Sequence, residues 1–325
     1  MRIGIDARFL THPQSGGFKT YTENLIAALT EIDTENEFIL YLDRPPEQQV
    51  ACTCAFESCE LSWVRKLSTT ARGGSTPTTS GEDTAPSRTP LAPRANVTLK
   101  VVPGRLPVLG MPWREQVTLA RQIAADRLDL FHAPCLTAPL VLPCPSVVTI
   151  HDIIWLFPSK FSKSNSWSAQ RKLMEWYYLL IPQYAAKHAS MVITVSQAAK
   201  QSIVDNLKLD SNRIIVTHEA PSQCFRKTDD VRSVEFVRRK YNLDSSFIFG
   251  IGSSDPRKNI QTLVQAYALL PSNVREKNLL VINWTHEFLS AELTGQIESL
   301  GLTDRVRFLQ HVSNEDMMQI GRAHV

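Results

Sequence analysis

Residues Phe247–Tyr267 read FIFGIGSSDPRKNIQTLVQAY, and this stretch decides the fold that we expect. Phe247 to Ile251 form an apolar run of strand length, and the residues from Gly252 to Pro256 are typical of a turn. From Asn259 onward, apolar residues recur at the spacing of a helix. The sequence therefore predicts a strand, a loop of small residues and a helix in direct succession.

Two cations, Arg257 and Lys258, lie at the end of this loop. The unpaired amides at the start of a helix attract anions, and fixed cations beside them strengthen the attraction. Without an anion, cations at a helix N-terminus are disfavoured by the helix dipole. The alternative is that both are solvated surface cations, but the pattern favours an anion site.

Composition excludes several classes of protein. The chain has 325 residues, which allows two domains with substantial cores. Its hydrophobic content of 43% and charged content of 21% are ordinary for a soluble globular protein. A net charge of +3 is too small to indicate a nucleic-acid partner. No apolar run is long enough to span a bilayer, and no signal peptide precedes the first strand.

The cysteines do not suggest a metal site or a disulfide framework. Six cysteines are scattered through a large chain, and we interpret them as reduced thiols of a cytoplasmic protein. Cys52, Cys54 and Cys59 lie close together, but no second pair of ligands follows at the spacing of a zinc site. We therefore expect no metal.

The N-terminal half begins like a Rossmann-like domain. A short strand from Arg2 to Ala7 precedes a loop of turn formers that contains Gly16 and Gly17, and an amphipathic helix follows. The fingerprint GxGxxG is absent, which argues against a dinucleotide-dependent dehydrogenase. The glycine pair alone is weak evidence for a binding loop, because any tight turn could contain two glycines.

A second informative stretch, VVTIHDIIWLFPSKFS, begins at Val147. It places His151 at the carboxyl end of a β-branched strand, the edge at which open α/β sheets bind ligands. A histidine there can donate a hydrogen bond to a ligand or steady a developing charge. The alternative is a structural histidine that caps the strand.

The two stretches together resemble the motifs of retaining, family-4-type glycosyltransferases of the GT-B fold. The resemblance implies an α/β architecture of two Rossmann-like domains that face each other across a cleft. It also implies that Arg257 and Lys258 hold the diphosphate of a nucleotide-sugar and that His151 faces the sugar. The resemblance implies two further groups of site residues. The donor-binding loop would contain Gly252, Ser253 and Ser254. The loop that approaches the acceptor or the donor phosphates would contain Gly16 and Gly17.

The expected domains follow from the same pattern. Residues 1–222 would form the acceptor-side domain, with residues 67–96 as a disordered insertion because they are crowded with Thr, Ser, Pro and Gly. A frameshift is the alternative for this segment. Residues 223–319 would form a truncated donor domain, and residues 320–325 a non-native tail that resembles translated sequencing-adapter DNA. The resemblance places an Asn-Gly pair where this chain has His218-Glu219, so no contacts are predicted there.

The expected reaction is transfer of a hexose, with mannose or glucose as candidates, from a nucleoside-diphosphate sugar to an acceptor hydroxyl with retention. The acceptor would be a glycan or a lipid-linked glycan in polysaccharide assembly, and neither cofactor nor metal would be required. A long helix from Trp167 to His188 could rest on the inner face of a membrane, although packing on its own domain is the preferred interpretation. The glutamate pair of the family's donor domain has no equivalent here, so we expect this chain alone to be inactive. An epimerase of the same fold and a non-catalytic module are the alternatives.

Overall fold

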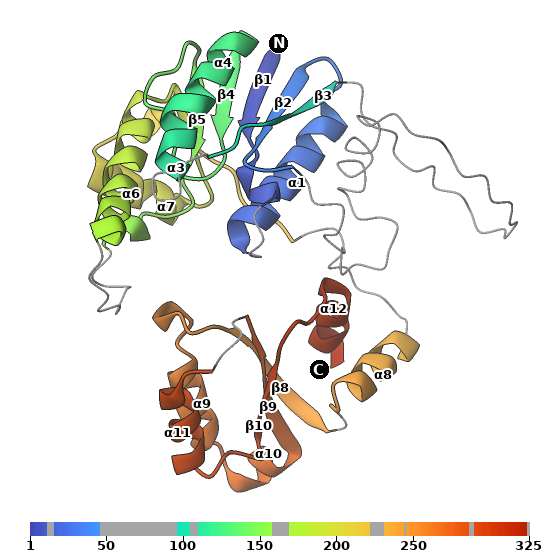
Figure 1. Cartoon of the computed structure of the whole chain (residues 1–325). Helices are drawn as coiled ribbons and strands as arrows, with labels where there is room; N and C mark the ends of the chain where they lie inside the picture. Colours follow the sequence, from blue (N-terminus) through green and yellow to red (C-terminus); the bar gives the residue numbers. More distant parts are fainter. Residues whose placement is uncertain are drawn as a thin grey trace, which may run out of the picture. The chain divides into compact units, whose positions relative to one another are not determined.

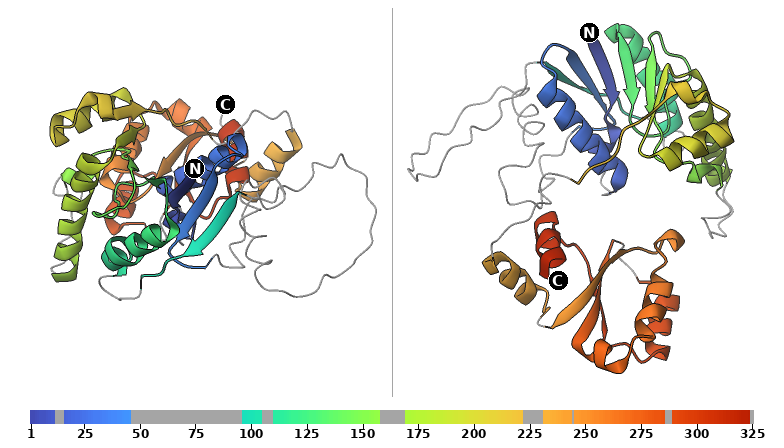
Figure 2. Two further views of the ribbon diagram at one scale, coloured as in Figure 1. Left: turned by 90° about the horizontal axis from the view of Figure 1, so that it is seen from above. Right: turned by 180° about the vertical axis from the view of Figure 1, so that it is seen from behind.

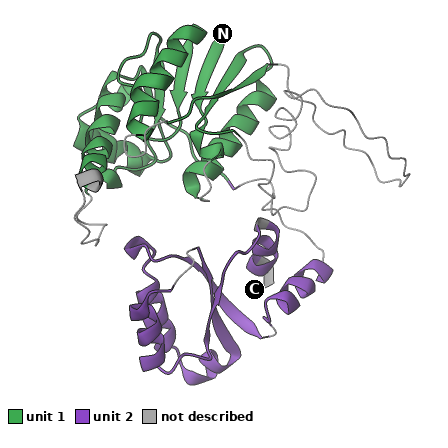
Figure 3. Cartoon of the chain, in the orientation of Figure 1, with its two compact units in different colours: residues 1–51, 57–158, 163–220 green, residues 52–56, 159–162, 221–325 purple. Residues whose placement is uncertain are grey.

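A computed structural model describes residues 1–11, 16–45, 96–104, 110–157, 169–221, 231–243, 245–285 and 289–323 of the chain. The described residues form two compact units, one that runs to Ala220 and one that begins at Pro221 (Figure 3). Each unit is a parallel β-sheet with helices on its faces (Figure 1). The expectation of an α/β fold is therefore confirmed for both.

Unit 1 is built on a seven-stranded sheet in the order β3-β2-β1-β4-β5-β6-β7. All six neighbouring pairs are parallel. The order places β1 and β4 side by side at the centre, as in Rossmann-like sheets. The strands are β1 (Arg2–Asp6), β2 (Glu37–Leu42), β3 (Val97–Val101), β4 (Leu130–Ala133), β5 (Ser146–Thr149), β6 (Met191–Thr194) and β7 (Ile214–Val216).

Helices cover both faces of this sheet (Figure 2). Ile26 of α1 packs with Phe38 and Leu40 of β2, whereas Leu119 packs with Tyr41, which points to the opposite face. The described helices and helical turns of unit 1 are η1 (Arg8–Leu10), α1 (Gly17–Ile32), α3 (Gly110–Trp113), η2 (Arg114–Leu119), α4 (Ala120–Asp126), η3 (Ile154–Leu156), α6 (Ala169–His188), α7 (Gln197–Leu207) and η4 (Ser211–Arg213).

Unit 2 has a three-stranded parallel sheet in the order β10-β9-β8. Its strands are β8 (Ser246–Gly252), β9 (Asn278–Trp284) and β10 (Val306–Leu309). Its helices are α8 (Val231–Lys240), η5 (Pro256–Lys258), α9 (Ile260–Ala268), α10 (Ser272–Lys277), α11 (Ala291–Ser299) and α12 (Asn314–Ala323). Figure 1 shows α9 and α11 on one face of the sheet, and α8 and α12 on the other.

Alternation along β9 explains how unit 2 buries both faces. Leu280 and Ile282 join the cluster formed with α9 and α11, while Val281 joins the cluster formed with α8 and α12. Ile320 of α12 is fully buried in that second cluster. Whether residues 320–325 are native is not decided by this packing and stays a prediction, and residues 324–325 lie outside the described part of the chain.

Two local features were not predicted from the sequence. The helix that begins at Gly110 contains a π-helical turn from Arg114 to Leu119, because apolar periodicity does not register an i→i+5 turn. The short helix α10 lies in a segment whose polar composition carries no helical period. The predicted insertion at residues 67–96 lies outside the described residues except for Asn96.

His132 in the middle of β4 is 7% exposed and contacts the Thr149 hydroxyl through Nε2 at 2.9 Å. Burial disfavours the charged ring and lowers the pKa of His132 to about 4, from about 6.5 in the unfolded chain. Between these values the unfolded chain binds a proton that the folded chain does not, so stability falls as pH decreases.

We therefore expect His132 alone to lower the free energy of unfolding by about 2 kcal/mol between roughly pH 7 and pH 5. His132→Asn keeps an amide beside Thr149 but cannot gain a charge, so its pH dependence should be smaller by that amount. Urea unfolding of both proteins at both pH values measures the difference. Equal pH dependence in the two proteins would contradict this explanation.

Candidate functional site

The predicted strand–loop–helix unit is present in unit 2. β8 ends at Gly252 and α9 begins at Ile260. Between them, the 3₁₀ turn η5 is capped by Asp255, whose carboxylate accepts from the Arg257 amide at 2.9 Å. Asn259 then adopts a left-handed conformation with a φ of 50°, which turns the chain into the helix. Neither this turn nor the asparagine conformation was foreseen.

The two predicted cations of this loop have different surroundings. Arg257 is about half exposed, and its guanidinium donates to the Asp255 carboxylate from Nε at 2.9 Å and from Nη2 at 2.5 Å. The hydrogen bonds from Arg257 lower the pKa of Asp255. Lys258 is exposed; its backbone amide donates to the Asp255 carbonyl at 2.9 Å, while no hydrogen bond or ion pair of its ammonium group is seen within the described ranges. The loop therefore presents an exposed Lys258 ammonium, whose charge also helps to lower the pKa of Asp255, and an Arg257 guanidinium that is hydrogen-bonded to Asp255.

The small residues of the loop are partly structural. A Cβ on Gly252 would lie 2.4 Å from Cδ1 of Ile260, so α9 can pack on the end of β8 only because this position is glycine. Ser253 is 9% exposed, and its hydroxyl accepts from the Asp255 amide at 3.2 Å. Ser254 is exposed. A role for any of the three in binding a donor stays a prediction.

Gly252→Ala should destabilise unit 2 by roughly 1–3 kcal/mol, because the added methyl group has to displace Ile260. Gly17→Ala is the matched control, since a Cβ there meets no described atom within 4 Å. Thermal unfolding of both variants checks the prediction. A Gly252→Ala protein as stable as Gly17→Ala would show that Ile260 is not fixed by this contact.

His151 lies two residues beyond the end of β5, at the carboxyl edge of the sheet in unit 1, as predicted. Its side chain is 14% exposed. Nε2 lies 3.2 Å from the carbonyl oxygen of Pro134, and Nδ1 lies 3.1 Å from a carboxylate oxygen of Glu219. The ring of Tyr21 packs against the imidazole edge-on at 4.5 Å between centroids. Glu219 lies where no contact had been predicted.

Gly16 and Gly17 lie on the same edge of unit 1 as His151. Gly17 is the first residue of α1, and Gly16 is extended, a conformation that any residue can adopt. Phe18, the next residue, has its ring centroid 5.3 Å from that of His151. The structure thus brings the glycine pair and His151 together in unit 1, while Arg257 and Lys258 belong to unit 2.

Beside this edge lies a buried ion network that the sequence did not reveal. The Asp6 carboxylate accepts from Arg114 Nη2 at 3.0 Å, and Arg8 donates to the Glu115 carboxylate at 2.6 Å. All four residues are at most 7% exposed. Burial alone would raise the pKa of Asp6, but the charges of Arg114 and Arg8 outweigh it, and the pKa is lowered. Two arginines and two carboxylates thus balance each other inside the unit.

The network extends to the loop that contacts His151. Arg8 donates to the Thr137 hydroxyl at 2.7 Å and to the Cys135 carbonyl at 3.4 Å. Cys135 follows Pro134, whose carbonyl faces His151. The Tyr177 hydroxyl donates to Glu115 at 2.6 Å, and the combination of burial and this carboxylate raises the pKa of Tyr177. The network therefore fixes the backbone on which the position of His151 depends.

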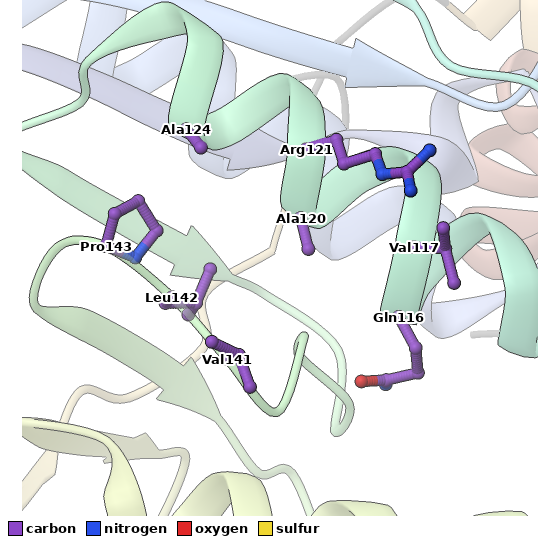
Figure 4. Close-up of a pocket in the computed structure, with 8 residues that line it drawn as sticks. All are labelled: Gln116, Val117, Ala120, Arg121, Ala124, Val141, Leu142 and Pro143. Carbon is purple, nitrogen blue, oxygen red and sulfur yellow. The ribbon is translucent and has the colours of Figure 1, made fainter.

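A cavity of about 350 Å³ lies elsewhere in unit 1, between the helix that contains η2 and the loop that precedes β5 (Figure 4). Its lining is mainly apolar and consists of Gln116, Val117, Ala120, Arg121, Ala124, Val141, Leu142 and Pro143. None of the predicted site residues contributes to it.

Within the described ranges, no three His, Cys, Asp or Glu side chains are grouped so that they could hold a metal ion. None of the helices in the same ranges combines the length and hydrophobicity that a bilayer crossing needs.

Two comparisons of sequence place the chain among known proteins. Residues 76–220 match the family model described as Glycosyltransferase Family 4. The serotype-specific mannosyltransferase WbdA of Escherichia coli is 23% identical over 182 residues, which are 55% of this chain and 22% of that protein. The O-antigen chain mannosyltransferase B of Escherichia coli is 27% identical over 190 residues, which are 58% of this chain and 47% of that protein. The chain thus spans less than half the length of either relative.

Comparison of structures supports the same fold. HepE of Anabaena, solved in complex with UDP and glucose, has a TM-score of 0.59 and 18% sequence identity, over 99% of this chain and 72% of that chain. The expected resemblance to GT-B glycosyltransferases is therefore confirmed: residues 76–220 match the Glycosyltransferase Family 4 model, and the chain has the α/β fold of its GT-B neighbours.

Proposed function

We propose that the protein transfers a hexose from a nucleoside-diphosphate sugar to an acceptor hydroxyl with retention of configuration. The observation that carries this proposal is the exposed ammonium of Lys258 beside Arg257 at the entrance to α9. Such a pair suits the negative charge that develops on a departing diphosphate. Neither residue needs to react covalently.

The geometry suggests different tasks for the two cations. Lys258 provides a mobile point charge that can follow the leaving phosphate. Arg257 is oriented by Asp255, and its planar guanidinium has five donors, so it can keep that carboxylate and still meet a phosphate oxygen. In this proposal, Gly252, Ser253 and Ser254 shape the loop around the donor. No metal or cofactor is proposed.

Unit 1 would supply the groups that face the sugar and the acceptor. His151 lies at the carboxyl edge of the sheet, and Gly16 and Gly17 leave open space beside it. A side chain at either glycine would enter that space and restrict the approach of a substrate. With no carboxylate nucleophile identified, we favour departure and attack on the same face of the sugar, assisted by the diphosphate itself.

The relatives favour particular substrates. Two of them are mannosyltransferases by name, and HepE was solved with UDP and glucose. We therefore propose mannose or glucose as the transferred sugar and a glycan or lipid-linked glycan as the acceptor. For an acceptor of that kind, we propose that the protein acts in the cytoplasm and contacts the inner face of a membrane.

Transfer assays on the product of the complete gene test the proposal, because this chain spans less than half of its curated relatives. A panel of nucleotide-sugars is incubated with and without mannose-containing acceptors, and products are analysed by mass spectrometry and by NMR of the anomeric centre. We expect an acceptor-dependent product with retained configuration. An epimerised nucleotide-sugar formed without acceptor would establish the epimerase, and binding without turnover would establish a non-catalytic module. The present 325-residue chain should show weak or no donor binding.

A further inference from the structure

At the carboxyl edge of unit 1, other side chains besides His151 are accessible to a ligand. His151 is 14% exposed, whereas the Glu219 side chain beside it is 54% exposed. The Phe18 side chain, also at this edge, is 37% exposed. The groups that solvent or a ligand can reach most easily are therefore the carboxylate and the phenyl ring, and His151 lies behind them.

The contacts of His151 already use both of its nitrogens. Nε2 faces the Pro134 carbonyl and Nδ1 faces the Glu219 carboxylate, and both partners only accept hydrogen bonds. Because each nitrogen already faces an acceptor oxygen, neither is free for a sugar hydroxyl. In contrast, the second carboxylate oxygen of Glu219 has no partner within the described ranges. The ring is thus placed to hold the carboxylate, and the carboxylate is placed to accept from a ligand.

The aromatic residues extend this surface. The Phe18 ring lies 5.4 Å from Phe9 and 5.3 Å from His151, so neighbours on two sides fix it. Gly16 and Gly17 precede it without side chains, and a Cβ on either would meet no described atom within 4 Å. Phe18 therefore borders open space rather than a packed interior.

From this arrangement we propose that unit 1 contains a carbohydrate-binding subsite formed by Glu219 and Phe18, with His151 as a positioning residue. Glu219 accepts hydrogen bonds from ring hydroxyls, and the negative face of Phe18 receives the polarised C–H groups of a pyranose. This inference rests on the proposed function: within a glycosyltransferase, the occupant is the pyranose of the acceptor.

The charge of the subsite favours a neutral sugar over a phosphate. The Glu219 carboxylate would repel a phosphate group at the distance at which it would accept from a hydroxyl. The first amides of α1 could attract an anion near Gly16, and this competing occupant is separated from the sugar by the experiment below.

The test uses saturation-transfer NMR of the 325-residue chain with α-1,3-mannobiose as the probe. We expect mannobiose signals with the unmodified chain. Glu219→Gln, which loses the charge but keeps the shape, should weaken binding by roughly five- to tenfold, since hydrogen bonds to charged groups exceed neutral ones by about 1 kcal/mol. Phe18→Ala should weaken it by about three- to tenfold, while Phe18→Tyr retains it.

Three controls make the result specific. Glu31→Gln removes an exposed carboxylate from α1 in the same unit and should leave binding unchanged. Lys277→Ala, which removes an exposed lysine of α10 in unit 2, should also leave it unchanged. Glu219→Ala should move the ¹⁵N shift of His151 Nδ1, the nitrogen that faces Glu219, which reports the positioning contact directly.

The proposal is overturned if mannobiose gives no signal, if binding survives both Glu219→Ala and Phe18→Ala, or if inorganic phosphate displaces the disaccharide from this edge. Absence of transfer by the complete gene product would refute the proposed function but would not alter a positive binding result. Conversely, an acceptor KM that is the same for the unmodified complete gene product and for its Glu219→Gln variant would refute only the subsite proposal. That result would leave the proposed function standing.

Discussion

Replacement of Lys258 with alanine is expected to lower transfer by the complete gene product by about 10²–10³-fold, the usual effect of losing one preorganised group that stabilises developing charge. The Lys258 ammonium is exposed and makes no hydrogen bond or ion pair within the described ranges, so the change removes a charge but keeps the backbone hydrogen bond to Asp255. The loss should appear in turnover and in donor affinity, because the diphosphate carries charge before and during departure. Initial rates with varied donor and calorimetric titration with the nucleotide-sugar measure both.

Arg257→Ala should have an effect of similar size. It also leaves the Asp255 carboxylate without the guanidinium that donates to it. Asp255→Asn therefore accompanies it, to show how much of the loss comes from the unpaired carboxylate. Lys277→Ala is the matched control, since Lys277 is an exposed lysine of α10 in the same unit. If Arg257→Ala and Lys258→Ala both kept wild-type turnover and donor affinity, the proposal that these two cations hold the donor diphosphate would be abandoned.

Arg114→Met is expected to destabilise unit 1 by roughly 3–5 kcal/mol, the range found when one partner of a buried ion pair is removed. Arg114 is fully buried, and besides Asp6 it donates to the carbonyl oxygens of Val102 and Tyr41 at 2.9 and 3.2 Å. The substitution leaves the Asp6 carboxylate with Arg8 as its remaining cation and leaves both carbonyls without this donor. Urea unfolding near neutral pH measures the loss.

Arg121→Ala provides the control for that prediction. Arg121 lies seven residues further along the same helix and is exposed, so its removal should change stability by at most about 0.5 kcal/mol. Asp6→Asn combined with Arg114→Met should recover part of the stability, because no uncompensated carboxylate remains next to the new side chain. Equal stability of Arg114→Met and Arg121→Ala would mean that the network does not stabilise the folded unit.

The strands and the loop after β8 could be predicted because their signals are local. Apolar and β-branched runs ended within one or two residues of the observed strand ends, as for the run from Phe247 to Ile251, which lies within β8. The carboxyl-edge position of His151 followed from the end of such a run. These features depend on residues adjacent in sequence, which is why a single sequence contains them.

The missed features depend on residues distant in sequence. Asp6 and Arg114 are 108 positions apart, and His151 and Glu219 are 68 apart. Nothing in a local pattern distinguishes a charge that meets its partner in the interior from one that is solvated. The pairing of Arg257 with Asp255 is local, but it depends on a 3₁₀ turn that composition alone did not indicate.

The π-helical turn at Arg114–Leu119 constrains how the helix between residues 110 and 126 can change in length. An i→i+5 turn encloses one residue more than an α-helical turn, and here it directs the adjacent residues Arg114 and Glu115 into the interior together. Deletion of a single residue from this segment would relax it to regular α-helix and remove the extra residue that lets Arg114 and Glu115 both point inward. One of the two charges would then lose its partner. Substitutions on the exposed face of this helix should be tolerated far more readily than any insertion or deletion within it.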